Sequence, residues 1–154
     1  MKYVHTNIIA QDWQRLVQFY EAVFACQPVP PQRDLAGEWL DKGTGIPLAH
    51  LRGVHLRLPG WGENGPTLEI YQYDEMAEKP EPLANRLGLG HIAFLVDDVA
   101  AIREKVLQHG GRDLGQIAHT VVPGVGRLTF VYLTDPEGNI LEIQHWSPEG
   151  LLSS

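Results

Sequence analysis

The segments Gly65-Pro66-Thr67-Leu68-Glu69-Ile70 and Gly138-Asn139-Ile140-Leu141-Glu142-Ile143 share the pattern Gly-x-x-Leu-Glu-Ile. A histidine precedes each segment: His5 in the first half of the chain and His91 in the second. At the same short distance after each histidine stands an aspartate, Asp12 or Asp98, that can cap a helix. The same small unit therefore occurs twice, with one histidine and one glutamate in each copy.

The first copy has the apolar spacing of strands around one helix. Tyr3–Ile9 predicts a short strand, and the apolar residues after Asp12 recur every three or four positions, which is typical of a helix with one buried face. Leu51–Leu58 alternates between apolar and polar residues, and Thr67–Tyr73 follows a Gly/Pro-rich turn. These two segments are predicted to pair as a hairpin.

The first copy is longer than the second because of the segment Gln32–Ile46. This segment has no strand alternation and is interpreted as an insertion that could cover the site, with a short helical turn near Glu38–Asp41. The polar stretch Asp74–Asn85 then contains two prolines and is interpreted as a linker.

The second copy repeats the order of elements. Leu89–Val96 predicts a strand, Asp98 caps a helix, and strands are expected near Gly115–Thr120, Leu128–Leu133 and Ile140–Trp146. The predicted fold class is α+β, with two tandem βαβββ modules at about 1–74 and 88–147 within a single domain spanning 1–154. The modules are expected to form a cupped mixed sheet.

The amino-acid composition limits the classes of binding partner that are expected. The chain has 154 residues, a formal net charge of −7 and no basic cluster, so nucleic acid is not an expected partner. Its one cysteine, Cys26, fits a reducing compartment. No stretch predicts a signal peptide or a membrane span. A cytoplasmic protein that acts on a small-molecule substrate is expected.

Strand parity places the repeated side chains on one face of each predicted sheet. His5 and His91 lie on the face opposite the residues that pack on the helix, and Glu69 and Glu142 lie opposite their Leu and Ile neighbours. A charged residue in such a strand is costly unless it has a partner. His5, Glu69, His91 and Glu142 are therefore predicted to bind a metal ion.

The ligand chemistry indicates a reaction class. Two imidazoles and two carboxylates suit one divalent ion per site, such as Ni²⁺, Zn²⁺, Co²⁺, Mn²⁺ or Fe²⁺. Such an ion stabilises the negative charge that develops when a carbon next to a carbonyl loses its proton. Glu142 or Glu69 could leave the metal and act as the base.

Other residues on the same strand faces are candidates for substrate binding. His55 and Arg57 share a face, and Arg57 could bind a carboxylate or phosphate. An exposed polar strand face explains this pair equally well. Tyr71 and Tyr73 share the face of Glu69, and Trp146 that of Glu142. Aromatic core packing is the alternative role for these three rings.

On these residues the chain resembles the vicinal oxygen chelate superfamily, which includes glyoxalase I, epimerases, extradiol dioxygenases, fosfomycin-resistance enzymes and bleomycin-binding proteins. The resemblance rests on the two histidine openings, on the helix Phe19–Phe24 and on the segment Asp135–Glu142. It implies paired βαβββ modules around one metal ion, and commonly a homodimer.

The resemblance also implies an activity. His5, Glu69, His91 and Glu142 match the ligand positions of glyoxalase I, so the expected function is a metal-dependent lyase or isomerase that transfers a proton next to a metal-bound carbonyl. Ile9 and Tyr73 stand where bacterial glyoxalase I has an Arg and an Asn that hold glutathione, so weak use of glutathione is expected. An epimerase, an extradiol-type dioxygenase, an antibiotic-modifying transferase and a metal-free binding protein are the alternatives.

Overall fold

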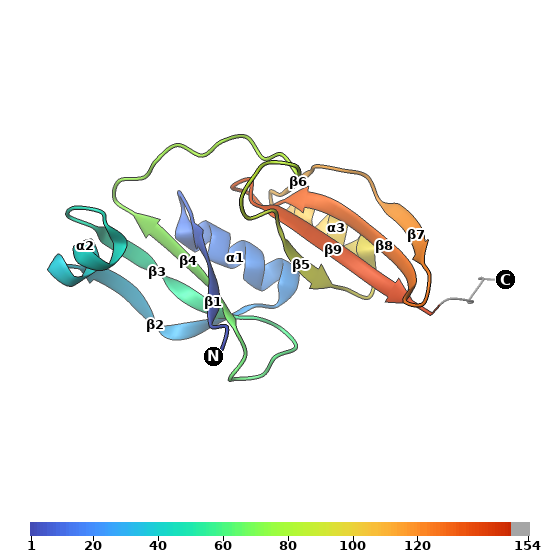
Figure 1. The fold of residues 1–154 in the computed structure, drawn as a ribbon, viewed down its shortest axis with the longest axis horizontal. Coiled ribbons are helices and arrows are strands. Elements are labelled where there is room, and N and C mark those ends of the chain that lie inside the picture. Colours follow the sequence, from blue (N-terminus) through green and yellow to red (C-terminus); the bar gives the residue numbers. More distant parts are fainter. Residues whose placement is uncertain (149–154) are drawn as a thin grey trace. The chain divides into compact units, whose positions relative to one another are not determined.

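A computed structural model describes residues 1–148 of the chain. The chain divides into two compact units, and the boundary lies between Lys79 and Pro80, inside the polar stretch interpreted as a linker. Figure 1 shows a helix packed on a sheet in each unit. In the described part of the chain, no helix has the length and apolar character needed to cross a membrane.

The first unit is a four-stranded mixed sheet in the order β1-β4-β3-β2. Strand β1 runs parallel to β4, and the other neighbours are antiparallel. Helix α1 packs on β3 and β4. The elements are β1 (His5–Ile9), α1 (Trp13–Phe24), β2 (Gln27–Ala36), α2 (Glu38–Thr44), β3 (His50–Arg57) and β4 (Thr67–Tyr73).

The second unit repeats this arrangement in the order β5-β9-β8-β6, with β7 paired to β8. Strand β5 runs parallel to β9, and helix α3 packs on β8 and β9. The elements are β5 (Ile92–Leu95), α3 (Val99–Gln108), β6 (Arg112–Asp113), β7 (Ala118–Val122), β8 (Gly126–Thr134) and β9 (Ile140–Ser147). The predicted fold class, α+β with two βαβββ modules, is confirmed. The units are called the first and second module below.

Helices α1 and α3 begin with equivalent N-cap residues, Asp12 and Asp98. The Asp12 carboxylate accepts a hydrogen bond from the backbone N–H of Arg15 at 3.0 Å, and Asp98 accepts one from Ala101 at 2.9 Å. Each bond satisfies an N–H that the first helical turn leaves without a partner. The two aspartates therefore cap equivalent helices, as their spacing from the histidines predicts.

The interpretation of Gln32–Ile46 as an insertion without strand structure was wrong. Strand β2 continues to Ala36, where it pairs with His50, and the helical turn extends to Thr44 as α2. The strand signal is obscured because the register shifts between Val29 and Arg33, next to two prolines that cannot donate to the ladder. β5 is also shorter than predicted, so His91 immediately precedes the strand.

Helix α2 covers one end of the sheet on the face opposite α1. Leu40 from α2 packs in a small apolar cluster with residues of β3 and β4. By strand parity these strand residues share the face of His55 and Glu69. The cluster consists of Leu40, Ala49, Leu51 and Tyr71, with Leu35 and Tyr73 packed against it.

His50, the first residue of β3, contacts carboxylates on both sides: Asp34 on β2 and Asp74 just after β4. His50 Nδ1 lies 2.7 Å from a carboxylate oxygen of Asp74, and Nε2 lies 2.7 Å from one of Asp34. Arg52 pairs with the other oxygen of Asp74. Because both ring nitrogens face carboxylates, these hydrogen bonds raise the pKa of His50 above its usual value.

This contact predicts a pH-dependent contribution of His50 to stability. A pKa raised by folding gives stabilisation that is complete below the unfolded-state pKa, about 6.5, and that is lost as pH rises through the folded-state pKa. The difference in unfolding free energy between wild type and His50→Gln should therefore shrink from pH 6 to pH 9. Urea denaturation at both pH values measures this difference in unfolding free energy. A difference that stays constant would contradict an ionic contact of protonated His50 with Asp34 and Asp74.

Candidate metal and substrate site

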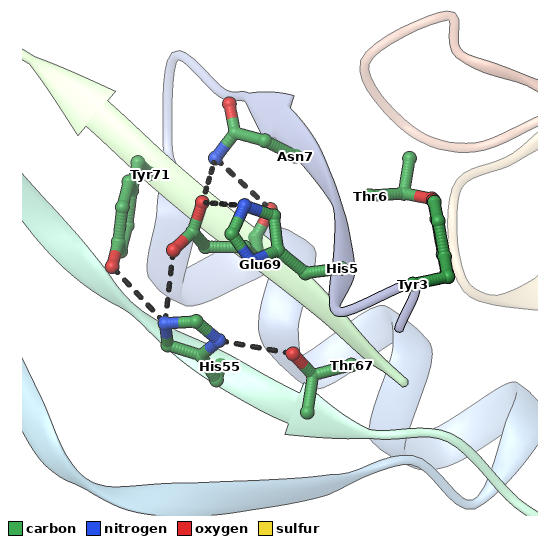
Figure 2. A network of polar contacts seen from close by, with 8 residues as sticks. All are labelled: Tyr3, His5, Thr6, Asn7, His55, Thr67, Glu69 and Tyr71. Atoms are coloured by element: carbon green, nitrogen blue, oxygen red, sulfur yellow. Dashed lines mark hydrogen bonds and ion pairs between the residues drawn. The ribbon is translucent and has the colours of Figure 1, made fainter. Parts of the chain in front are cut away.

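Three predicted site residues meet on one face of the first module. Glu69 lies between two histidines: its Oε2 is 3.5 Å from His5 Nε2 and its Oε1 is 2.9 Å from His55 Nε2. The two imidazole rings are 5.7 Å apart, edge to face. Figure 2 shows the three side chains converging from β1, β3 and β4.

The sheet register explains why these residues meet. Glu69 on β4 is directly opposite Asn7 on β1 and His55 on β3. Side chains that are directly opposite in neighbouring strands share one face of the sheet. His5, two residues before Asn7, shares that face as well. Glu69 is therefore the centre of the cluster.

The carboxylate of Glu69 is buried, with 9% of the residue exposed. Its neighbours Leu68 and Ile70 are also buried, so the strand is covered on both faces. The side-chain amide of Asn7 donates a hydrogen bond to Glu69 Oε2 at 2.9 Å. A buried charge needs such partners, and a cation beside the two histidines would be a further one.

His55 has a defined orientation. Its Nδ1 lies 3.0 Å from Thr67 Oγ1, and its Nε2 lies 3.3 Å from the hydroxyl of Tyr71. Burial lowers the pKa of His55, although Glu69 opposes this shift. Burial, together with Glu69, raises the pKa of Tyr71 to about 12, so its hydroxyl stays protonated at neutral pH.

The second module has a corresponding pair. His91 Nε2 lies 2.9 Å from Glu142 Oε2. Tyr132 on β8 is directly opposite Glu142, and its ring centroid is 4.9 Å from that of His91. The register therefore places Tyr132 where the first module has His55, and Ala93 where it has Asn7.

The three side chains of the first module can hold a metal ion. One ligand atom of each of His5, His55 and Glu69 lies within 4.8 Å of the others, and no other group of three such residues was found within residues 1–148. A divalent ion bound at about 2.1 Å separates neighbouring ligand atoms by about 3.0–3.4 Å. His5 and His55 lie 3.5 and 2.9 Å from Glu69, close to this range, and each contacts a different oxygen of the carboxylate.

The remaining predicted substrate residues are more dispersed. Arg57 shares the strand face of His55 and is half-buried. Tyr73 packs against the α2 cluster, which fits the alternative role in apolar packing. Trp146 lies in the second module, on β9, where its ring N–H donates to the Gln144 side chain at 2.9 Å.

Arg33 is a site residue that the sequence analysis missed. It pairs with Gly53 on β3, two residues from His55, and its positive charge acts to lower the pKa of both His55 and Tyr71. The guanidinium group of Arg33 therefore adds a positive charge to this face of the sheet. The segment Arg33-Asp34-Leu35 does not alternate between polar and apolar residues, so the sequence carries no strand signal here.

The absence of a side chain at Gly53 leaves room for the Tyr71 ring. A Cβ on Gly53 would lie 1.9 Å from the Ile70 carbonyl oxygen and 2.5 Å from the Tyr71 ring. Only glycine therefore allows Tyr71 to lie across β3 beside His55.

The family model of the Glyoxalase/Bleomycin resistance protein/Dioxygenase superfamily matches residues 2–143 of the chain. The comparison with curated proteins found no match.

Solved structures share the fold. A glyoxalase family protein from Bacillus cereus has a TM-score of 0.77 at 17% identity, covering 95% of this chain and 93% of that chain. A glyoxylase/bleomycin resistance protein/dioxygenase domain from Frankia has a TM-score of 0.58 at 15% identity, with coverages of 96% and 98%. A glyoxalase family protein from Enterococcus faecalis has a TM-score of 0.56 at 21% identity, with coverages of 93% and 96%.

Proposed function

Because the chain belongs to the Glyoxalase/Bleomycin resistance protein/Dioxygenase superfamily, we propose that it is a divalent-metal-dependent lyase or isomerase of the glyoxalase type. Its reaction is proton transfer at a carbon next to a carbonyl group. The observation that supports this most directly is the repeated contact between a histidine and a glutamate, His5 with Glu69 and His91 with Glu142. These four residues are the proposed metal ligands, with Ni²⁺, Zn²⁺, Co²⁺, Mn²⁺ or Fe²⁺ as the ion.

The proposed roles follow from the chemistry of the side chains. A bound divalent ion would lower the energy of the negative charge that develops on the carbonyl oxygen. Glu142 accepts the proton from the carbon as a carboxylate and returns it, so no net oxidation occurs. Glu69 is hydrogen-bonded to Asn7, which favours a role in holding the ion.

The proposed substrate is a small carbonyl compound with an anionic group. Arg33 and Arg57 supply positive charge on the strand face that carries His55, and guanidinium groups pair well with carboxylates and phosphates. Tyr71, Tyr73 and Trp146 are the proposed aromatic contacts. A homodimer in the cytoplasm is the proposed state of the protein.

Deuterium exchange tests this proposal whatever product the reaction forms. The protein is loaded with Ni²⁺ or Co²⁺ and incubated in ²H₂O with a panel of small α-hydroxycarbonyl acids, thioesters and the methylglyoxal–glutathione hemithioacetal. We expect deuterium next to the carbonyl of an anionic compound, no exchange after EDTA treatment, and weak turnover of the hemithioacetal. Exchange that persists without metal would contradict the proposed mechanism.

A second candidate function has one specific observation in its favour. Two imidazoles and one carboxylate, as in His5, His55 and Glu69, are the ligands typical of Fe²⁺ oxygenases. An oxygenase would consume O₂ with a catechol when loaded with Fe²⁺, whereas the lyase or isomerase would not. Oxygen uptake without deuterium exchange would select this alternative.

A further inference from the structure

The two modules differ at one position beside their glutamates. His55 is directly opposite Glu69 in the first module, and Tyr132 is directly opposite Glu142 in the second. Imidazole is a common metal ligand, whereas a neutral phenol is a poor one. The first module thus presents three donor groups for a divalent ion and the second presents two.

We propose, as an extension of the metal-dependent function above, that His55 is a third metal ligand of the first module. With His5 and Glu69 it would hold the ion on one face of the first module. His55 Nε2 lies 2.9 Å from Glu69 Oε1, and one ligand atom of each of His5, His55 and Glu69 lies within 4.8 Å of the others, which is close enough for the three to bind one ion.

The surroundings of His55 suit ligation through Nε2. A histidine that binds metal through one nitrogen usually donates the N–H of the other to an acceptor, which fixes the tautomer and the ring orientation. Thr67 Oγ1, 3.0 Å from Nδ1, is such an acceptor. Its hydroxyl can either donate or accept, so it can satisfy Nδ1 with and without an ion at Nε2.

The extra ligand resolves a conflict between two roles of Glu142. A carboxylate that is needed to hold the ion cannot leave it freely, and without His55 the first module would offer only His5 and Glu69. With His55 the first module offers three donors of its own.

Calorimetric titration of the full chain with Co²⁺ tests the role of His55. We expect His55→Ala to weaken Co²⁺ binding at least about 100-fold, because a direct ligand matters more than the outer partners of a ligand, which change affinity about 10- to 100-fold. Glu142→Gln should weaken it less. The matched control is His119→Ala, since His119 Nδ1 also lies 2.9 Å from a threonine hydroxyl, that of Thr129.

Thr67 and Tyr71 distinguish ligation from a structural role. Thr67→Val removes the acceptor for Nδ1 and should weaken Co²⁺ binding about 10-fold, whereas Thr67→Ser should restore it. Tyr71→Phe removes only a hydroxyl near Nε2 and should leave binding intact or slightly tighter. The visible spectrum of bound Co²⁺ should change in Thr67→Val but not in Thr67→Ser.

The outcomes separate this inference from the proposed function. If wild type binds no Co²⁺, the metal-dependent function itself is wrong. If wild type binds Co²⁺ and His55→Ala binds it as tightly as His119→Ala does, only the ligand role of His55 is overturned. His55→Gln, which keeps a polar side chain beside Glu69, replaces His55→Ala if circular dichroism shows that the alanine variant is unfolded.

Discussion

Glu142→Gln is expected to lower the rate of deuterium exchange about 10²- to 10⁴-fold while the protein stays folded. A glutamine amide has almost the same shape as the carboxylate but cannot accept a proton from carbon, and loss of a general base typically costs this much. The side chain is half-buried beside His91, so the amide can occupy the same space. The kcat for exchange and the far-ultraviolet circular dichroism spectrum measure the two effects.

The matched control is Glu104→Gln, which makes the same chemical change on helix α3. Glu104 lies on the exposed surface beside Arg103, so its replacement should leave exchange within about twofold of wild type. Full exchange activity in Glu142→Gln would remove Glu142 as the base. Glu69→Gln would then be the next variant, because Glu69 is the other candidate.

Local sequence patterns predicted most of the elements near the site. The alternation in Thr67–Tyr73 and Ile140–Trp146, and the Asp12 and Asp98 caps, depend on neighbours in the chain, so their signals are visible in the sequence. Strand parity also placed Glu69 on the face away from Leu68 and Ile70, as the structure does.

The contacts around Glu69 depend on strand register, which the sequence does not state. The hairpin from β3 to β4 was predicted, yet the pairing of His55 with Glu69 and of Arg57 with Thr67 follows from where the turn begins. A register shifted by one residue would move His55 to the helix side of the sheet. His55 was therefore predicted only as a substrate contact.

Strand β2 was missed because a register shift interrupts its pattern, and this shift also places side chains beside the site. The register shift between Val29 and Arg33 interrupts the alternation, but it brings Arg33 opposite Gly53 and Leu35 opposite Leu51. A bulge redirects side chains in this way and is common beside functional sites. Strand β2 and the positive charge of Arg33 were therefore missed for the same reason.

Tyr73 packs against the apolar cluster of Leu40, Ala49, Leu51 and Tyr71. Leu40 lies in the segment Glu38–Asp41, for which the sequence predicts only a short helical turn. This contact joins residues far apart in the sequence, so no local pattern predicts it. Tyr71 belongs to the same cluster but also reaches His55, which links α2 to the site.

The second large effect is expected from His91→Ala, which should weaken Co²⁺ binding at least about 100-fold although His91 lies outside the group formed by His5, His55 and Glu69. The reason is the proposed ligand set, in which His91 shares one ion with His5 and Glu69. Wild type should accordingly bind one ion per chain, whereas independent binding by the two modules would give two. Calorimetric titration measures both the stoichiometry and the affinity.

His109→Ala is the control for this variant, because His109 is exposed at the end of α3, where its Nδ1 lies 2.8 Å from the Lys105 carbonyl oxygen. Its Co²⁺ affinity should equal that of wild type. If His91→Ala binds one ion with unchanged affinity, the three donors of the first module are sufficient, and His91 has no part in holding the metal. If His5→Ala also retains the ion, the whole ligand set is wrong, because His5 and His91 are the imidazoles that the repeated sequence pattern places beside the two glutamates.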